Sequence, residues 1–294
     1  MQEAYKYGLL AVLLWSTVAT AFKIGLQHLS PTEMVFYSSL FSTLFLVTVV
    51  IYQKKISAVV EHIKKSFKYV LILGFINPFL YYLVLFKAYD LLPAQEAQAI
   101  NYTWALMLSF LSVVFLKQKL TLSDVVAGFI CYFGVLVIST KGDIVSLEFS
   151  SVFGVSLALL STILWASYWI VNTKIKADPI VGLTGNFLVA MPIVALYYFL
   201  TQPLNTPTIE GLLSGVYIGL FEMGFTFMLW LKAMKVTTST SKIANLIFLS
   251  PFLSLVFIYF LLGEKIYLAT IVGLVLIILG LILQQRGLLN KKIS

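Results

Sequence analysis

Long apolar runs recur along the whole chain, and no other feature constrains its fold as strongly. Each run has about twenty residues, the length that an α-helix needs to cross the hydrocarbon core of a bilayer. Of the 294 residues, 60% are hydrophobic and only 11% are charged, whereas a soluble domain carries about 25% charged residues. No segment alternates polar and apolar residues as a membrane β-strand does. The sequence therefore predicts an all-α polytopic membrane protein.

The apolar runs predict ten transmembrane helices, over residues 6–25, 32–52, 69–90, 94–116, 121–140, 151–173, 179–201, 209–235, 238–262 and 266–286. Ten crossings place both termini on the same side of the membrane. Of the 20 Lys and Arg residues, all fall on that side except Lys23, Lys87, Lys141 and Lys265. Because basic residues are enriched in cytoplasmic segments, we expect a multi-pass protein of the cell (inner) membrane with both termini in the cytoplasm.

The longest of the predicted cytoplasmic segments, residues 53–68, combines lysines with apolar residues at helical spacing. Ile56, Val59, Val60 and Ile63 would share one face of a helix. This pattern is typical of an amphipathic helix that lies on the inner leaflet. A solvated basic loop is an equally good interpretation of the same residues.

The two halves of the chain resemble each other when the sequence is shifted by 145 residues. Lys87-Ala88 then aligns with Lys232-Ala233, and Phe115-Leu116 aligns with Phe260-Leu261. Each half, residues 1–145 and 146–294, contains five predicted helices. Because five is odd, the second half must enter the membrane from the opposite face. Two inverted five-helix repeats are a frequent plan of secondary transporters, which bind substrate near the midplane between the repeats.

Glu222 is the most unusual residue of the predicted membrane helices. A carboxylate at the centre of such a helix costs roughly 2.5–3.5 kcal/mol, so its presence requires a functional or structural reason. The same shift aligns Glu222 with Asn77, which Pro78 follows. We expect both residues to line a central substrate site, with hydrogen bonding between packed helices as the alternative. Glu222 would either carry a proton or pair with a substrate ammonium group.

Further polar and aromatic residues are candidates for the same substrate site because they recur at helical spacing within predicted helices. Aromatic residues also form belts at membrane interfaces, and that alternative stays open for them. Together with Glu222 and Asn77, the candidates for substrate binding are Trp15, Asn101, Tyr102, Trp104, Trp165, Tyr168, Trp169, Thr226, Trp230 and Asn245.

No motif of the chain points to an enzyme. The sequence has neither a paired carboxylate set nor a glycine-rich phosphate loop, and the lack of a Walker motif argues against transport driven by ATP. The lone Cys131 and two distant histidines predict no metal site, and we expect no cofactor. The basic residues follow the topology, so no nucleic-acid partner is expected. Solvated positions at helix ends are expected for three acids, Asp90, Glu96 and Glu264.

Two stretches resemble the repeat of the EamA family in the drug/metabolite transporter superfamily. They begin FKAYDLLPAQEAQAINYTW at Phe86 and LWLKAMKVTTSTSKIANLI at Leu229. The second copy keeps the family's Leu-Gly-Glu-Lys at residues 262–265, and the first has Lys117-Gln118-Lys119 there. The motifs LLWST (13–17), INYTW (100–104), LWASYWIVNTK (164–174) and YYFLT (197–201) are closest to those of bacterial aromatic amino acid exporters. Ala105 replaces the proline that such exporters usually have.

This resemblance implies a secondary transporter that exports amino acids or similar small metabolites by alternating access. Its partners would be a small-molecule substrate and the lipid bilayer, and the chain would act as a monomer or a homodimer. The alternatives are a carrier for a different class of metabolite, and a non-transporting membrane protein such as a structural or sensory subunit. The fold of such a family does not by itself determine the substrate.

Overall fold

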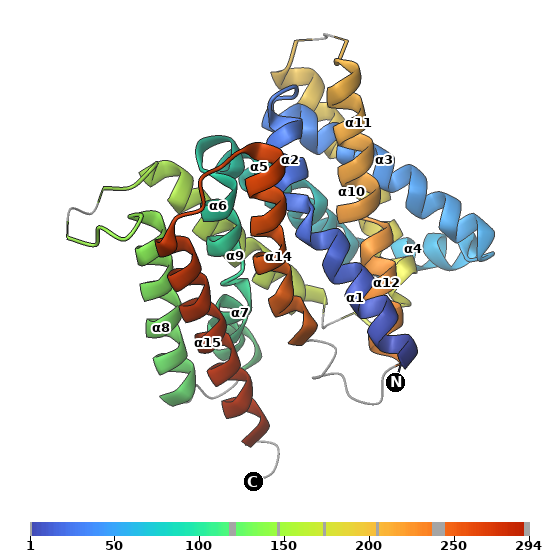
Figure 1. Ribbon diagram of the computed structural model, residues 1–294. Helices are drawn as coiled ribbons and strands as arrows, with labels where there is room; N and C mark the ends of the chain where they lie inside the picture. Colours follow the sequence, from blue (N-terminus) through green and yellow to red (C-terminus); the bar gives the residue numbers. More distant parts are fainter. Residues whose placement is uncertain are drawn as a thin grey trace. The chain divides into compact units, whose positions relative to one another are not determined.

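The computed structural model describes residues 2–117, 122–145, 148–172, 175–203, 206–236 and 245–290. Within these ranges every regular element is a helix (Figure 1). Eight helical segments of this described part are long and apolar enough to cross a membrane, and two shorter apolar helices are Leu246–Leu262 and Leu268–Gln284. The predicted all-α class with several membrane-length helices is confirmed. The arrangement of ten crossing helices in two inverted repeats stays a prediction.

The chain packs as two compact units, each built from two segments that lie far apart in the sequence. Unit 1 contains Met1–Phe86 and Ile175–Leu262, and unit 2 contains Lys87–Lys174 and Gly263–Ser294. Each unit therefore combines residues from both halves of the chain. The predicted repeats, 1–145 and 146–294, divide the chain by similarity of sequence. The two units divide it by packing, and the two divisions differ.

The bounds of the helices follow the apolar runs. Unit 1 holds α1 (Gln2–Ser16), α2 (Val18–Leu26), α3 (Pro31–Tyr52), α4 (Ile56–Gly74), the π-helical turn η1 (Phe75–Leu80), the start of α5 (Tyr81–Leu91), α10 (Pro179–Thr201), α11 (Ile209–Tyr217), the π-helical turn η2 (Ile218–Glu222), α12 (Phe225–Val236), the 3₁₀ turn η3 (Asn245–Leu249), α14 (Ser250–Phe257) and the π-helical turn η4 (Ile258–Leu262). Unit 2 holds the end of α5, α6 (Ala94–Asn101), α7 (Trp104–Leu116), α8 (Leu122–Ser139), α9 (Val152–Asn172) and α15 (Leu268–Asn290).

Helices α3 and α10 begin in the same way, with a polar cap followed by proline. The Ser30 hydroxyl accepts a hydrogen bond from the Glu33 amide, and the Glu33 carboxylate accepts one from the Ser30 amide. Asp178 caps α10 by accepting from the amides of Ile180 and Val181 at 3.0 and 3.4 Å. Such caps satisfy amides that the first helical turn leaves without partners.

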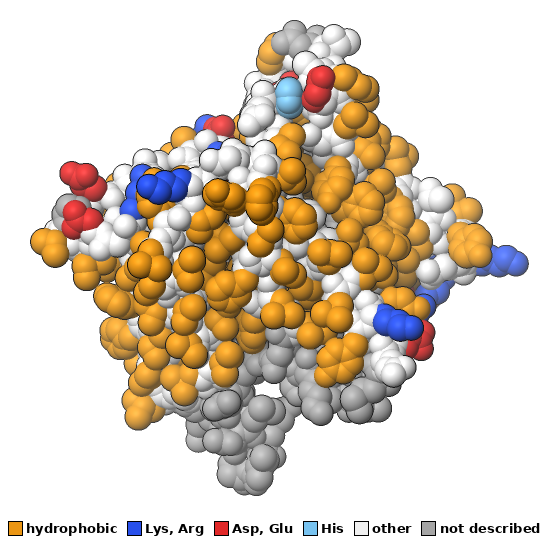
Figure 2. Space-filling model, in the orientation of Figure 1, with side chains coloured by type: hydrophobic (Ala, Val, Ile, Leu, Met, Phe, Trp, Pro, Cys, Tyr) orange, Lys and Arg blue, Asp and Glu red, His pale blue; other side chains and the backbone are white. Residues whose placement is uncertain are grey.

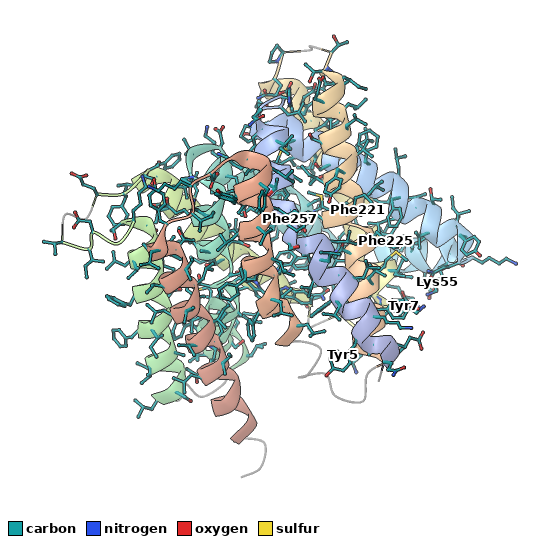
Figure 3. The ribbon with its side chains drawn as sticks, viewed as in Figure 1. Tyr5, Tyr7, Lys55, Phe221, Phe225 and Phe257 are labelled. Atoms are coloured by element: carbon teal, nitrogen blue, oxygen red, sulfur yellow. The ribbon has the colours of Figure 1, made fainter. Side chains whose placement is uncertain are left out.

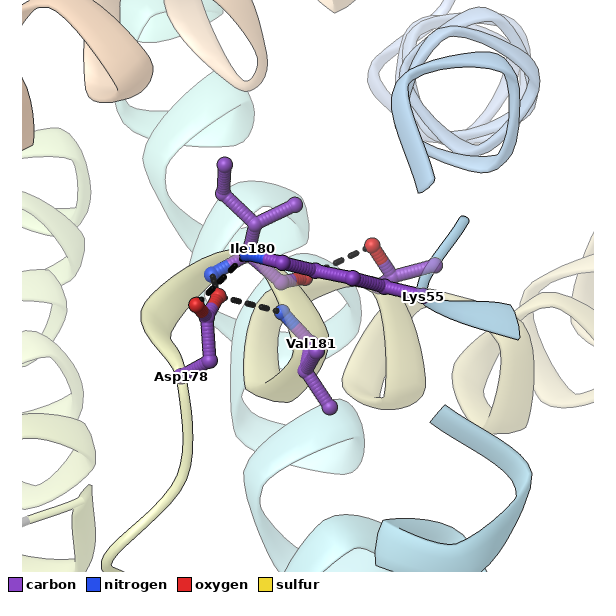
Figure 4. A network of polar contacts seen from close by, with 5 residues as sticks. Lys55, Asp178, Ile180 and Val181 are labelled. Carbon is purple, nitrogen blue, oxygen red and sulfur yellow. Dashed lines mark hydrogen bonds and ion pairs between the residues drawn. The ribbon is translucent and has the colours of Figure 1, made fainter. Parts of the chain in front are cut away.

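Asp178 also joins α10 to the connection between α3 and α4 (Figure 4). The Lys55 Nζ donates to its carboxylate at 2.7 Å. Burial raises the pKa of Asp178, but the hydrogen bonds from Lys55 and from the two amides outweigh it and bring the pKa below its ordinary value. The stabilisation from these contacts is therefore present above about pH 4 and is lost as the pH falls through the lowered pKa.

The basic segment after α3 is helical. It forms the first part of α4, and Ser66 interrupts the helical backbone with φ −124° and ψ 25°. Val59 is buried against Val50 and Val181, whereas Ile56 and Val60 are exposed. The loop interpretation of these residues is therefore wrong, and the contact with the inner leaflet stays a prediction.

In unit 1, glycines of the helical segment that contains Glu222 allow α3 to approach closely. A Cβ atom on Gly215 would lie 2.8 Å from the Tyr37 Cβ, and one on Gly219 would lie 2.5 Å from the Ser38 carbonyl oxygen. Close approach of two backbones is what small residues permit in membrane helices. The segment from α11 to η2 is thereby held against α3.

In unit 2, α8 and α15 pack along their length. The Cys131 thiol lies 3.3 Å from the Ile277 carbonyl oxygen, and a Cβ on Gly273 would lie 2.6 Å from the Gly134 carbonyl oxygen. Figure 2 shows hydrophobic side chains over the outer surface of this pair. They include Phe129 and Phe133 of α8 and Leu268 and Leu279 of α15, all exposed. An apolar outer surface is what a bilayer requires of these helices.

We predict that Gly219→Ala lowers the thermal stability of the purified protein, because the new methyl group would meet the Ser38 backbone. Overpacking of this kind costs about 1–3 kcal/mol. Gly182→Ala is the matched control, since its Cβ would meet only Ala177 at 3.9 Å. Thermal unfolding in detergent, followed by intrinsic fluorescence, measures both. Equal midpoints for the two variants would contradict the packing described for α11, η2 and α3.

Candidate substrate-binding site

Four interruptions of the helices coincide with candidate residues from the sequence. α1 ends next to Trp15 and α2 starts at Val18, and α6 ends at Asn101 before α7 starts at Trp104. Asn77 and Glu222 each lie in a π-helical turn, η1 and η2. In both turns a backbone amide reaches the carbonyl five residues earlier, from Tyr81 to Ile76 and from Met223 to Ile218. Such wide turns occur often at functional sites.

The carboxylate of Glu222 is held by two neutral donors from other helices. The Tyr82 hydroxyl of α5 donates to Glu222 Oε1 at 3.0 Å, and the Trp15 indole of α1 donates a second hydrogen bond. Tyr82 is buried, whereas Glu222 and Trp15 are half-buried. The three helices thus meet around the carboxylate of a half-buried residue.

Aromatic rings adjoin this carboxylate. The Trp15 ring packs 5.4 Å from the ring of Trp230 and 5.7 Å from that of Phe227, between ring centres. Phe227 and Trp230 lie on α12, and both are half-buried. We call Glu222, Tyr82, Trp15, Phe227 and Trp230 the Glu222 cluster. All five belong to unit 1.

Thr226 holds the π-helical turn rather than extending the accessible surface of the cluster. Its hydroxyl donates to the carbonyl of Phe221, and the side chain is fully buried. A wide turn leaves such a carbonyl without its usual amide partner, so the threonine completes it. Phe221 and Phe225, labelled in Figure 3, lie beside Glu222 and Thr226 in the same helical segment.

Asn77 lies in η1, which packs against α10. Its side chain is 3% exposed, and its Oδ1 has no hydrogen-bond partner among the described residues. Asn77 and Glu222 thus both lie in wide turns, and the hydrogen bonds that the structure describes at Glu222 come from Tyr82 and Trp15.

A second group of candidates meets within unit 2. The Asn101 Nδ2 donates to the Ser161 hydroxyl at 3.0 Å and so joins α6 to α9. The rings of Trp165 and Tyr168 stack at 5.3 Å, and Trp104 meets the edge of Trp165 at 6.4 Å. We call Asn101, Ser161, Trp104, Trp165, Tyr168 and Trp169 the Trp165 cluster.

The remaining candidates have different surroundings. Trp169 packs 5.9 Å from Trp165, and its indole nitrogen is buried with no hydrogen-bond partner among the described residues. Tyr102 follows the last residue of α6 and is half-buried. Asn245 is the first residue of η3, and its side chain lies outside the described part of the chain.

The sequence analysis missed a buried polar network at the start of α6. Glu96, which we expected to be solvated, is only 2% exposed. Ser150 donates to its carboxylate, and Lys141 and Glu264 act on it electrostatically. Next to it, the Gln95 side chain contacts the Thr270 hydroxyl at 2.6 Å, and Glu264 accepts from the Ala94 amide at 2.8 Å. The sequence carried one signal of this burial: Glu96 lies three residues after Pro93, in a segment of small residues.

Metal chemistry has no basis in the part of the chain that the structure describes. There, no three His, Cys, Asp or Glu side chains come close enough to hold a metal ion. The chemistry open to the two clusters is therefore that of a carboxylate, amides, hydroxyls and aromatic faces. Such groups bind and orient a small molecule that has an apolar body and a polar head.

Comparison with known proteins assigns the chain to a family. The sequence model of the EamA-like transporter family matches residues 3–140 and, a second time, residues 152–284. A protein of known crystal structure has the same fold, with a TM-score of 0.69 and 20% identity over 100% of this chain and 99% of its own. At that identity the likeness concerns the fold alone.

Two relatives of this chain carry transporter names. An "Uncharacterized transporter" of Archaeoglobus fulgidus is 25% identical over 281 residues, which are 94% of this chain and 96% of that relative. The "Uncharacterized transporter YoaV" of Bacillus subtilis is 24% identical over 297 residues, which are 97% and 98% of the two chains. The chain therefore belongs to the EamA-like transporter family and is a membrane transporter of the drug/metabolite transporter type.

Proposed function

We propose that this transporter is a secondary carrier that exports amino acids or similar small metabolites across the cell membrane by alternating access. The observation that supports it best is the coincidence of broken helices with polar candidates, at Trp15, Asn77, Asn101 and Glu222. Secondary transporters commonly build their substrate sites from discontinuous helices, because interrupted turns expose backbone and side-chain groups to the ligand. A helix that only anchors a protein in lipid has no need of such interruptions.

The pattern of the family match supports two inverted repeats in this proposal. The same family sequence fits residues 3–140 and 152–284, which lie inside the predicted repeats 1–145 and 146–294. Five helices in each repeat give ten crossings and opposite orientations, so that the two repeats exchange shapes during transport. Both termini would then lie in the cytoplasm, and the basic helix at the start of α4 would lie on the inner leaflet.

In this proposal each cluster is by itself a candidate for contact with a substrate, the Glu222 cluster in unit 1 and the Trp165 cluster in unit 2. The Glu222 cluster provides a carboxylate and aromatic faces, and the Trp165 cluster provides an amide, a hydroxyl and aromatic faces. An ionisable residue within a membrane segment marks a substrate or ion pathway by default. Glu222, which lies in the span Ile209–Trp230, meets that description.

Counterflow in liposomes tests the function directly. Purified protein is reconstituted into vesicles that are preloaded with one unlabelled compound, and the uptake of the same labelled compound is followed. We expect accumulation with at least one member of a panel of amino acids, amines, nucleosides and sugars. Accumulation only with nucleosides or sugars would indicate a carrier for another class of metabolite. Failure across the whole panel would favour a non-transporting membrane protein.

We predict that Asn101→Ala reduces the exchange rate of an accepted substrate about tenfold, since it removes a hydrogen bond of about 1.4 kcal/mol between α6 and α9 at the interrupted turn. Gln202→Ala is the matched control, because it also removes a side-chain amide. The Gln202 amide oxygen lies 2.9 Å from the Ser30 hydroxyl, and Gln202 belongs to neither cluster. Trp165→Ala should reduce exchange as well, and Trp165→Phe should restore part of it. Exchange at the wild-type rate in folded Asn101→Ala and Trp165→Ala would assign both side chains to packing.

We also predict the sidedness of two exposed positions. A cysteine at Lys64 should be protected from a membrane-impermeant thiol reagent in intact cells, and a cysteine at Glu210 should react with it. The physical basis is the concentration of basic residues on the side of Lys64. Cells permeabilised with detergent provide the control, because both cysteines should then react. Labelling at Lys64 in intact cells would reverse the proposed orientation.

A further inference from the structure

We propose that the Glu222 cluster binds organic ammonium compounds, so that among the small metabolites of the proposed function the preferred substrates are amines with an aromatic or apolar body and no carboxylate. This inference rests on the proposed transport function and names its substrate class. It follows from three properties of the described residues of the cluster: the carboxylate has no cationic partner among them, aromatic rings accompany it, and none of them is a cation that would pair with a substrate carboxylate.

The first property is the charge. Both groups that donate to Glu222, the Tyr82 hydroxyl and the Trp15 indole, are neutral. Among the described residues, no Lys, Arg or His forms an ion pair with Glu222. Two neutral donors orient the carboxylate and satisfy part of its hydrogen-bonding capacity, but they leave its negative charge without a cation. In a membrane segment that charge is costly unless it is paired, and a cationic ligand supplies the pair.

The second property is the aromatic surface beside the charge. Trp15 donates to Glu222 and packs against both Phe227 and Trp230, so one ring contacts the carboxylate and two more lie against that ring. The residues that carry these rings, and Glu222 itself, are half-buried rather than fully enclosed in the core. A cation gains about 0.5–2 kcal/mol over the face of an aromatic ring, most over tryptophan. Rings around an acid are the usual surroundings of a bound ammonium group, and the same faces pack against an apolar body.

The third property concerns a substrate carboxylate, which an amino acid would bring. In the described part of α12, the ammonium group of Lys232 lies 4.2 Å from the centre of the Tyr7 ring. Lys232 follows Glu222 by ten residues, or about 15 Å of helix. Within the described Glu222 cluster, an amino acid carboxylate would therefore face the like charge of Glu222, whereas an amine without a carboxylate avoids that repulsion.

Three indole compounds that differ only in their polar head test the proposal. Tryptamine carries an ammonium group, tryptophol replaces it with a hydroxyl, and tryptophan adds a carboxylate to it. Calorimetry on the full-length protein in detergent measures the Kd of each, and inhibition of counterflow gives a second readout. We expect tryptamine to bind at least about tenfold tighter than either of the others. Equal affinities for tryptamine and tryptophol would overturn the proposal.

The variants locate the ammonium group. Glu222→Gln keeps the size and one acceptor oxygen but removes the charge, so it should weaken tryptamine about tenfold and leave tryptophol unchanged. Glu210→Gln, an exposed acid on α11, is the matched control and should change neither Kd. If tryptamine binding weakened equally in both variants, the role of Glu222 would be overturned. It would also be overturned if tryptamine binding weakened in neither variant.

A second variant keeps the proposal testable if Glu222→Gln fails to fold. Trp230→Leu removes an aromatic face and should lower the preference for tryptamine over tryptophol several-fold, because only the cation depends on the charge distribution of the ring. Phe225→Leu on the same helix is its control, since the Phe225 ring packs against Phe221 at 6.4 Å rather than within the cluster. An unchanged preference in Trp230→Leu would count against the aromatic part of the site.

The outcomes separate this inference from the transport function. Selective tryptamine binding without counterflow of any compound would support the site and contradict transport. Counterflow of tryptophan that tryptamine does not inhibit would support transport and contradict the ammonium site. If Glu222→Gln instead abolished accumulation driven by a pH gradient and left the Kd of tryptamine unchanged, Glu222 would be a proton carrier, and the ammonium site would be wrong.

Discussion

The hydrocarbon core of a bilayer offers no hydrogen-bond partners, so each polar group of a spanning segment must find its partner within the protein. The interrupted helices of this chain meet that constraint locally. Thr226 donates to the Phe221 carbonyl at one wide turn, and Thr103 donates to the Ile100 carbonyl at 2.8 Å in the break between α6 and α7. Once the backbone is satisfied in this way, neighbouring side chains such as Glu222 and Asn101 are available to other groups. The candidate site depends on this local compensation.

Close packing of glycines decides which side of the Glu222 helix meets which neighbour. Gly215 and Gly219 let the backbone of α3 approach one side of α11 and η2. Glu222 is therefore left to contact α5 and α1, where Tyr82 and Trp15 provide donors. Larger residues at the two glycines would push α3 away, and the position of Glu222 relative to these donors would change with it.

Glu96 and Glu222 differ in what surrounds them. Glu96 has Lys141 in its electrostatic environment and Ser150 as a donor, and the adjacent Gln95 and Glu264 link the start of α6 to the connection before α15. Glu222 is half-buried, and its donors among the described residues, Tyr82 and Trp15, are neutral. The first arrangement brings a cation, a hydroxyl donor and a second carboxylate to Glu96, and Glu96 Oε1 has no hydrogen-bond partner among the described residues. The surroundings of Glu222 leave its charge to be paired by a ligand. The proposed ammonium site is therefore at Glu222 and not at Glu96.

The sequence by itself determined the class of fold, most helix bounds, the family and the exceptional position of Glu222, because long apolar runs and a charge within them carry their physical meaning without tertiary context. Only the tertiary structure decided that Tyr82, which no pattern singled out, donates to Glu222, that Thr226 completes a wide turn, and that Glu96 is buried. These contacts join residues far apart in the chain or depend on a local widening of the helix, and neither leaves a periodic signal in the sequence.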